Sequence, residues 1–491
     1  MTILRIGLLV AAAALACGQE RAAVETWVAS HQRQIMGEFN DLLRIPNVGT
    51  DHANIRRNAE FIRGLLERHG MQAELLETAG NPLVYAEKNV PGAARTVLYY
   101  IHYDGQPVDL SRWKTDPFRP VMRDGARDIS NWNVLEKFPD DWRIYARSAS
   151  DDKAPIVAFC AAMDALQGKF AGNVHVVIDG EEEMGSPSLT AAIARYRDKL
   201  KASLLLILDG PVHPNGRPTL AFGARGIVTL DLTVYGPKMA LHSGHYGNWI
   251  PNPAMRLAQL LASMKDEQGR TTIEGFYAGV PAVTAEERRV LRSVPDDEPA
   301  LLKLFGVAKP DAVGESLQEA LQFPSLNVRG MRSGYVDEPR TIIPTEATAA
   351  IDMRLVKETP SARMVERVRA HIEKQGYHVT EGEPDDATRL KYPKLARLKA
   401  GEVMEAYRTE PESAAGIEVT RALTRMWGAE PVRIRTMGGT VPIAPFIREL
   451  GVPAVAVPIV NFDNNQHSDN ENLRVGNLWS GIATLAAVLG M

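Results

Sequence analysis

Short apolar runs alternate with helix-like repeats along the first 226 residues, and the alternation returns near the C-terminus. Between Ile55 and Leu66 the apolar positions recur at helical spacing, and Gly70 follows, a residue that often ends helices. Lys153–Leu166 is apolar nearly all round, which predicts a buried helix. Uninterrupted apolar runs are typical of strands in a buried parallel sheet, and four occur: Thr96–Ile101, Val174–Ile178, Leu204–Leu208 and Ala454–Val460. The pattern predicts an α/β domain with a mixed, largely parallel sheet.

The rhythm changes after Gly226. Ile227–Tyr235 alternates as a strand does, and residues 253–264 have the period of an amphipathic helix. A long charged insertion at residues 265–322 comes next. The elements predicted after it are strands at Ser325–Gly330 and Thr345–Val356, a helix at Ser361–Gln375 and a strand at Tyr377–Glu383. Without the insertion the order is β-α-β-β-α-β, the ferredoxin-like order. We therefore expect an α+β domain at 227–395, inserted into a larger domain made of 25–226 and 396–491.

The composition is that of an ordinary globular protein. The chain has 491 residues, of which 45% are hydrophobic and 24% charged, and this excludes the disordered and low-complexity classes. A formal net charge of −4 gives no electrostatic reason to expect a nucleic acid as partner. Two cysteines, Cys17 and Cys160, are too few for a disulfide framework or a cysteine-based zinc site.

The N-terminus has the features of an export signal. Arg5 precedes an apolar run, Ile6–Ala16, that is too short to span a membrane and ends in small residues. Residues 1–17 are therefore expected to be a signal peptide, and the protein to be exported to the periplasm or the medium. Cys17 follows the expected cleavage site, so a lipoprotein, anchored to the membrane through this cysteine, stays open as an alternative. Lipoprotein signals usually carry Leu three residues before the cysteine, where Ala14 stands here.

Polar side chains follow each of the predicted buried strands. In an open α/β sheet, ligands bind beyond the carboxyl ends of the strands, which is where these residues fall: His102 and Asp104, Glu181–Glu183, Asp209, and His467. Histidines and carboxylates without cysteine suit Zn²⁺, Mn²⁺ or Co²⁺. Neighbouring glutamates allow one to bind metal while the other acts as general base. A hydrogen-bonded structural histidine and a solvated acidic loop remain the simpler interpretations of each cluster taken alone.

Seven short motifs, taken in order, carry a resemblance to a known family. They are His-Tyr-Asp-Gly-Gln-Pro-Val-Asp at 102–109, Ser-Asp-Asp-Lys at 150–153, Glu-Glu-Met-Gly-Ser at 182–186, Gly-Ala-Arg-Gly at 223–226, Leu-His-Ser-Gly at 241–244, Gly-Gly-Thr at 438–440 and His-Ser-Asp-Asn-Glu at 467–471. With them the sequence resembles peptidase family M20, the dinuclear metallopeptidases of the aminoacylase, carnosinase and glutamate carboxypeptidase type. The resemblance runs from about Glu25 to the C-terminus, and the residues Gln106–Val108 are most similar to the dipeptidase branch.

The resemblance implies a set of roles in the larger domain. Two divalent ions per subunit are expected, with Zn²⁺ preferred and Mn²⁺ or Co²⁺ as alternatives. His102 and Asp209 would hold one ion, Glu183 and His467 the other, and Asp151 would bridge them. Asp104 would orient His102, and Glu182 would be the general base.

The resemblance also makes the inserted domain a lid that forms a homodimer. His242 would reach into the partner subunit's site and stabilise the oxyanion. Arg354 would pair with a substrate carboxylate, a task that suits the guanidinium fork. Thr341, Gly439 and Thr440 would contact the substrate.

We therefore expect a metallopeptidase that cleaves amide bonds in short peptides. An N-acyl-amino-acid deacylase with the same metals is the first alternative, and a non-catalytic binding protein on this fold is the second. Two departures from the family pattern concern the substrate pocket. Ala146-Arg147-Ser148 stands where Gly-Arg-Gly is usual and Ala154 where glycine is usual, and residues 128–142 are rich in tryptophan.

Overall fold

The computed structural model describes residues 2–338 and 340–491, with side chains from Gln19 onward. The chain divides into two compact units. Unit 1 comprises residues 1–223, 408–435 and 442–491, and unit 2 comprises residues 224–407 and 436–441. The boundary therefore falls after residue 407, whereas the sequence pattern placed it at 395.

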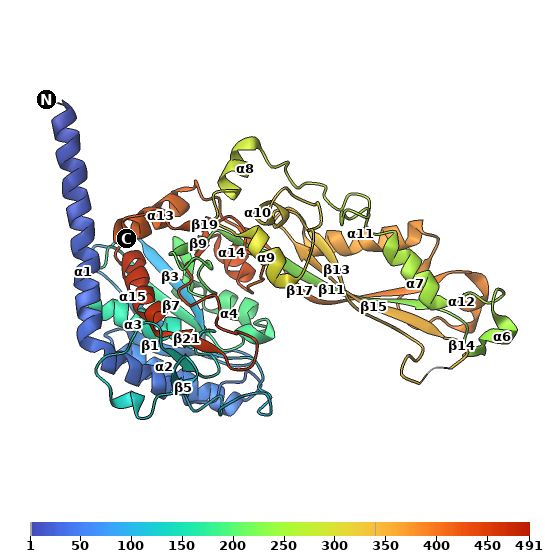
Figure 1. The fold of residues 1–491 in the computed structure, drawn as a ribbon, viewed down its shortest axis with the longest axis horizontal. Coiled ribbons are helices and arrows are strands. Elements are labelled where there is room, and N and C mark those ends of the chain that lie inside the picture. Colours follow the sequence, from blue (N-terminus) through green and yellow to red (C-terminus); the bar gives the residue numbers. More distant parts are fainter. Residues whose placement is uncertain (1, 339) are drawn as a thin grey trace. The chain divides into compact units, whose positions relative to one another are not determined.

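Unit 1 is built on an eight-stranded mixed sheet (Figure 1). Its order is β1 (Gln72–Leu76), β2 (Leu83–Lys88), β7 (Asn173–Asp179), β3 (Thr96–His102), β8 (Leu204–Ile207), β20 (Ala454–Ala456), β9 (Thr219–Ala221) and β19 (Val432–Ile434). The central strands β7, β3, β8 and β20 are parallel to one another. This confirms the predicted mixed, largely parallel sheet, and it brings the carboxyl ends of β3, β7 and β8 to one edge.

Helices cover both faces of this sheet. Adjacent strand residues point to opposite faces: Tyr99 packs on Phe159 of α3 (Lys153–Ala165), while Tyr100 packs on Phe446 of α14 (Ala444–Leu450). Helix α3 is buried along its length, as its all-apolar sequence predicts, and it packs with α1 and α15. The helices of unit 1 are α1 (Thr2–Leu43), α2 (His52–Arg68), α3, α4 (Leu189–Arg195), α5 (Arg197–Leu200), α13 (Ala414–Trp427), α14 and α15 (Val475–Leu489).

A second, four-stranded sheet in unit 1 joins distant parts of the chain. Its order is β21 (Asn472–Arg474), β6 (Arg143–Tyr145), β4 (Val121–Asp124) and β5 (Arg127–Asp128). The tryptophan-rich stretch forms the short helix η1 (Trp132–Val134) beside it. Pairing of β21 with β6 fixes the segment that follows His467 against the segment that precedes Asp151.

Unit 2 contains a five-stranded sheet with helices on one face. The order is β13 (Ser325–Ser333), β15 (Glu346–Leu355), β11 (Gly226–Tyr235), β17 (Leu395–Met404) and β16 (His378–Thr380). Val228, Leu230, Leu232 and Val234 alternate along β11 and share a core with α7 (Pro253–Ala262) and α11 (Ser361–Lys374). The last strand of the ferredoxin-like order is β17, which pairs with β11. The predicted strand at 377–383 is instead the short edge strand β16.

The remaining elements of unit 2 are short. The charged insertion forms α8 (Ala285–Leu291), α9 (Glu298–Phe305) and α10 (Leu317–Ala320), and Thr284 and Glu287 form a capping box at the start of α8. The others are β12 (Leu241–His242), α6 (Ser243–Tyr246), β14 (Ile342–Ile343) and α12 (Asp386–Lys391), with β10 (Gly223–Ala224) and β18 (Tyr407–Arg408) at the boundary between the units.

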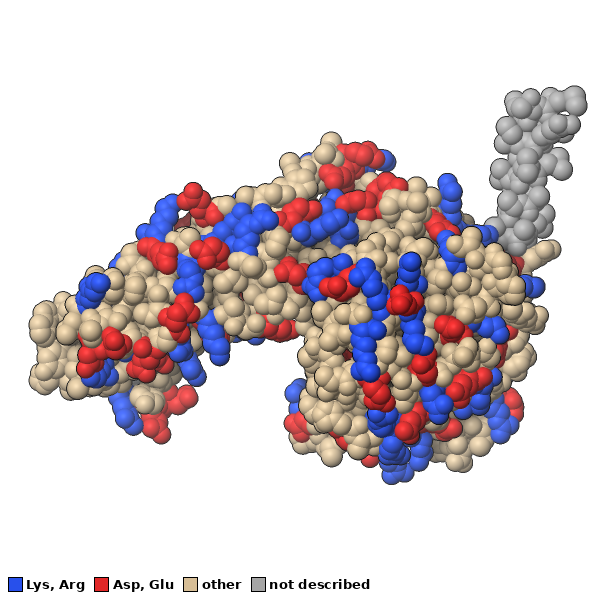
Figure 2. Space-filling view, turned by 180° about the vertical axis from the view of Figure 1, so that it is seen from behind, with Lys and Arg blue, Asp and Glu red and all other residues tan. Residues whose placement is uncertain are grey.

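Positive and negative side chains are interspersed over the surface seen in Figure 2, and neither sign forms a large patch of its own there. Among the described residues, no helix combines the length and apolar character needed to cross a membrane.

Candidate metal centre

Five loops of unit 1 carry the predicted metal ligands. His102 is the last residue of β3, and Asp209 follows β8 by two residues. Glu183 lies in the single turn η2 (Glu182–Met184), which follows β7. Asp151 lies just before α3, and His467 lies in the loop before β21. The parallel order of β7, β3 and β8 brings the first three loops together, and the β21–β6 pairing brings in the other two.

The ligand atoms form two groups of three. The first joins His102, Asp152 and Asp209, and the second joins Asp151, Glu183 and His467; within each group the atoms lie within 4.8 Å of one another. Asp151 contacts both histidines: its Oδ1 lies 2.9 Å from Nε2 of His102, and its Oδ2 lies 3.2 Å from Nε2 of His467. The two oxygens of one carboxylate are thus directed to two different ligand groups.

Asp104 holds three parts of this centre at once. Its Oδ1 lies 3.4 Å from Nδ1 of His102, the ring nitrogen opposite the one that faces Asp151. The same carboxylate accepts hydrogen bonds from the main-chain N–H groups of Glu182 and Glu183, both at 3.0 Å. Asp104 is fully buried, so it fixes the imidazole and the glutamate turn relative to each other without competition from water.

Glu471 ties the loop of His467 to the loop of Asp151. Its carboxylate accepts from the main-chain N–H groups of Ser148, Ser150 and Asp151, each at 2.9 Å. It also forms an ion pair with Arg147 at 2.8 Å, and both side chains are buried. His467 itself has φ of 59°, a left-handed conformation that few residues other than glycine adopt. The position of His467 is therefore determined by the surrounding loop contacts.

The titratable groups of the centre influence one another strongly. Burial and the nearby charge of Asp151 raise the pKa of Glu183 to about 7 and that of Asp209 to about 6. Burial also raises the pKa of Glu182 well above its usual range. For His467, the hydrogen bond to Asp151 raises the pKa to about 9. Buried carboxylates that repel one another, beside histidine nitrogens, are the donor set that divalent cations of the zinc type prefer. The residues present therefore fit two such ions.

Sequence analysis missed three residues of this neighbourhood. Asp152 belongs to the first ligand group and accepts from the main-chain N–H of His102 at 3.3 Å. Gln106 donates to Glu183 at 2.7 Å. Glu181, to which the sequence analysis assigns no role of its own, accepts from the main-chain N–H groups of Asn81 and Ser188 and so holds the glutamate turn in place. The adjacent carboxylates of Asp151 and Asp152 were visible in the sequence, but these hydrogen bonds leave no sequence pattern.

The predicted lid residues form two separate pairs in unit 2. His242, at the end of β12, is exposed, and Ser243 donates its main-chain N–H to the carbonyl oxygen of Thr341 at 2.9 Å. Arg354, near the end of β15, donates to the hydroxyl of Thr440 at 2.7 Å, and Gly439 precedes that threonine. In the pairing of β15 with β11, Arg354 lies opposite Ile227, whereas Glu346, at the other end of β15, lies opposite Tyr235. The two pairs therefore lie toward opposite ends of the sheet.

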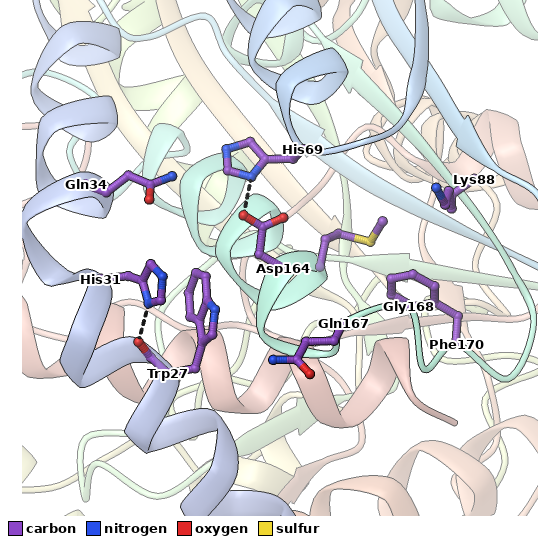
Figure 3. Close-up of a pocket in the computed structure, with 10 residues that line it drawn as sticks. Trp27, His31, Gln34, His69, Lys88, Asp164, Gln167, Gly168 and Phe170 are labelled. Carbon is purple, nitrogen blue, oxygen red and sulfur yellow. Dashed lines mark hydrogen bonds and ion pairs between the residues drawn. The ribbon is translucent and has the colours of Figure 1, made fainter.

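A cavity of about 380 Å³ elsewhere in unit 1 contains none of the predicted site residues. Figure 3 shows His69 and Asp164 hydrogen-bonded at its edge, and the imidazole of His31 facing the main chain of Trp27. Glu38 contacts the second ring nitrogen of His69 at 3.3 Å. These contacts connect α1, α2 and α3, so they serve the stability of unit 1.

The fold and the ligand groups define a metal-dependent hydrolase of the α/β type. The model of the family described as Peptidase family M20/M25/M40 matches residues 98–490. The chain therefore belongs to this family, and it is a metallopeptidase.

Individual relatives agree with this assignment. The chain is 27% identical to the Cys-Gly metallodipeptidase DUG1 of Candida albicans, over 91% of this chain and 92% of the relative. It is 26% identical to the human Beta-Ala-His dipeptidase, over 83% and 76%. Among solved structures it is similar to the M20 family metallo-carboxypeptidase Sso-CP2 from Sulfolobus solfataricus, with a TM-score of 0.77, 30% identity and coverage of 93% and 98%. The deacylase alternative is not favoured by these relatives.

The comparisons contradict the expected export. The yeast Cys-Gly metallodipeptidases to which the chain is similar are intracellular enzymes, so the prediction of an exported protein is wrong. A short apolar run after a basic residue is typical of secretory signals, but an apolar helix start has the same pattern, and α1 includes this run. The backbone of the expected cleavage site belongs to α1, and the side chains of this segment, that of Cys17 included, lie outside what the structure describes.

Proposed function

We propose that this protein is a dinuclear metallodipeptidase that hydrolyses short peptides with a free C-terminal carboxylate. The observation that carries the proposal is the division of the Asp151 carboxylate between His102 and His467, at 2.9 and 3.2 Å. A single carboxylate placed in this way suits a bridge between two cations. The dipeptidase names of the relatives support the choice of substrate.

In this proposal His102 and Asp209 hold one ion, Glu183 and His467 hold the other, and Asp151 is shared. Zn²⁺ is the first choice, with Mn²⁺ and Co²⁺ as alternatives, because the ligands are imidazole and carboxylate. When bound, such a pair of ions polarises the scissile carbonyl and lowers the pKa of the attacking water. Asp152, fully buried beside His102, completes the negative surroundings of the first ion.

Glu182 is the proposed general base. It precedes the ligand Glu183, and its main-chain N–H is held by Asp104 at 3.0 Å. Its carboxylate would take the proton from water as the new C–O bond forms, and would return it to the leaving amine as the C–N bond breaks. Asp104 thereby orients the base and the ligand His102 together.

Arg354 and Thr440 form the proposed clamp for the substrate carboxylate. The hydrogen bond between them, at 2.7 Å, fixes one side of the guanidinium and leaves further N–H groups for a ligand. Gly439, beside Thr440, would offer its main chain. A substrate with a free carboxylate would therefore be preferred to an amidated one.

His242 is proposed to act on the site of a second copy of the chain. Ile227, opposite Arg354, and Tyr235, at the end nearer β12, are eight residues apart in β11, which is about 27 Å at the usual strand rise. A dipeptide spans only about 7 Å, so Arg354 and His242 of one chain cannot contact the same dipeptide. A homodimer formed through the lid removes this conflict, and Thr341 would then act together with His242 on the partner's substrate.

Metal analysis combined with two substrate panels tests the proposal. We expect about two divalent ions per chain, complete loss of turnover after chelation, and recovery when Zn²⁺, Mn²⁺ or Co²⁺ is returned. A panel of free-acid dipeptides should be hydrolysed faster than a panel of N-acyl amino acids. Faster hydrolysis of the N-acyl panel would establish the deacylase, and a metal-free protein without turnover would favour the non-catalytic alternative.

A further inference from the structure

Unit 2 contains an apolar cavity that the proposed function does not use. It has a volume of about 340 Å³ and lies among α9, α10 and the start of β13, in the insertion drawn in green to yellow in Figure 1. We call it the insertion cavity. Its apolar wall includes Leu301, Leu302, Phe305, Leu317, Leu321 and Leu326. This size and character are typical of sites for small organic ligands.

The acidic residues around the insertion cavity already have partners. Asp311 lies 3.5 Å from Lys265. Glu315 pairs with Arg292 at 2.6 Å, and Glu298 accepts from the main-chain N–H of Leu317 at 2.7 Å. Asp311 and Glu315 are thus paired with cations, Glu298 is held by a main-chain N–H, and none of the three forms an ion pair with a further cation on the cavity wall.

Arg225 is such a cation. Its side chain lines the cavity, and the residue is only 7% exposed. Its Nη2 donates to the carbonyl oxygen of Phe323 and to the hydroxyl of Ser325, both uncharged groups. Its Nε has no hydrogen-bond partner. Asp352 attracts the guanidinium without forming an ion pair with it, and that carboxylate lies 3.9 Å from Arg329. A buried charge without a directly paired carboxylate is costly in free energy.

We propose that the insertion cavity binds a small apolar monocarboxylate, whose carboxylate neutralises Arg225 and whose hydrocarbon part packs on the leucines of α9 and α10. The positive charge of Arg225 selects an anionic group on the ligand, and the apolar wall selects the hydrocarbon part of the ligand. A free hydrophobic amino acid and a simple branched carboxylic acid share this chemistry. The proposal goes beyond the peptidase function, because no bond is broken at this site and no proposed metal ligand lines it.

Calorimetric titration of the full-length, metal-loaded protein tests the site. The ligands are 4-methylpentanoate and leucine, and 4-methylpentanol is the uncharged control. We expect saturable binding of at least one carboxylate and none of the alcohol. The Arg225→Gln variant should weaken this binding by about tenfold or more, since a charge-assisted contact is lost. The matched control is Arg397→Gln: Arg397 also has a buried Nε without a partner, and it does not line the cavity.

Further variants separate the insertion cavity from the proposed active site. Ala320 lines the cavity, so Ala320→Phe should abolish binding by filling it, whereas the exposed control Ala312→Phe should not. This pair keeps the test valid if Arg225→Gln folds poorly, which thermal unfolding would reveal. Arg354→Gln should retain the binding, because Arg354 does not line the cavity. Absence of carboxylate binding, equal binding by Arg225→Gln and Ala320→Phe, or loss of binding in Arg354→Gln would each overturn the proposal.

Discussion

The proposed metal-ligand residues of unit 1 and the proposed substrate-contact residues of unit 2 are held in very different ways. His102 and Asp104 are fully buried, and the loop of Asp151 is fixed by the buried carboxylate of Glu471. His242, in contrast, is exposed, and its ring contacts only its own loop through Gly244 and His245. The first region is organised within one chain. The second leaves His242 exposed, while Arg354 is held only by uncharged groups such as the hydroxyl of Thr440 among the described residues.

The difference suggests how the catalytic machinery is divided. Ligands that bind cations need a fixed geometry, and main-chain hydrogen bonds from several loops provide it. A residue that acts on another copy of the chain has to be exposed in the isolated chain. Variants of the two regions should therefore differ in how much metal they bind and in how much activity they keep. They should also differ in whether activity returns when a second inactive variant is mixed in.

Loss of the general base should have the largest effect. Glu182→Gln preserves the shape of the side chain but cannot accept a proton, so kcat should fall by about 10²–10⁴-fold. Metal content, measured on the same sample, should stay normal because Glu183 is intact.

The matched control for this variant is Glu181→Gln. Glu181 accepts main-chain hydrogen bonds from Asn81 and Ser188, so its substitution should lower thermal stability and leave clear turnover. If Glu181→Gln loses turnover while Glu182→Gln keeps it, the general base has been assigned to the wrong glutamate.

Loss of the exposed histidine should come next. His242→Ala removes one donor to the oxyanion, which typically lowers kcat by about 10²-fold or more. The metal content should be unchanged, because the ligands all lie in unit 1. His245→Ala is the control, since His245 lies beside His242 with 4.6 Å between ring centroids. An equal loss of kcat in both variants would indicate that the loop is damaged, and not that a specific oxyanion donor has been removed.

The carboxylate clamp should have a smaller effect. Arg354→Lys keeps the charge but loses the planar fork, so kcat/KM for free-acid dipeptides should fall by about tenfold. The wild-type protein should already hydrolyse C-terminally amidated dipeptides poorly. The clamp would be refuted if amidated and free-acid peptides were hydrolysed equally well by both forms.

The smallest expected effect concerns the stability of unit 1. Burial alone would lower the pKa of His69, but its hydrogen bonds to Asp164 and Glu38 raise the pKa from 6.5 to about 9. A pKa that is higher in the folded state stabilises the fold fully below the unfolded value and is lost as pH rises through the folded value. The stabilisation should therefore be complete below about pH 6.5 and disappear above about pH 9.

Thermal unfolding of His69→Gln across this pH range provides the measurement. Tm should fall below that of the wild type at pH 6, by roughly 2–4 °C for each kcal/mol lost, and the gap should close by pH 10. His31→Gln is the control, because a ring nitrogen of His31 faces a main-chain oxygen. A gap for His69→Gln that does not change with pH would contradict the assigned ion pairs.

Much of this organisation could be predicted from the sequence. The apolar runs that end at His102, before Glu182 and before Asp209 identified parallel strands, and parallel strands bring their carboxyl ends to one edge. The role of Glu471 could not be predicted in this way, because it depends on main-chain N–H groups some 320 residues earlier. The strand β17 was also missed. Its second half, Ala400–Met404, is exposed apart from the half-buried last residue, so it lacks the alternation that marks a half-buried strand.

The most direct test of the account mixes two inactive variants, His242→Ala and Glu182→Gln, under conditions that exchange subunits. In a mixed dimer, one site has an intact Glu182 from its own chain and an intact His242 from the other. With random exchange of equal amounts, half of the dimers are mixed and each has one complete site, so about a quarter of the wild-type activity should return. Absence of recovery, with mixed dimers demonstrated by mass, would contradict the proposal that His242 acts on a second copy of the chain.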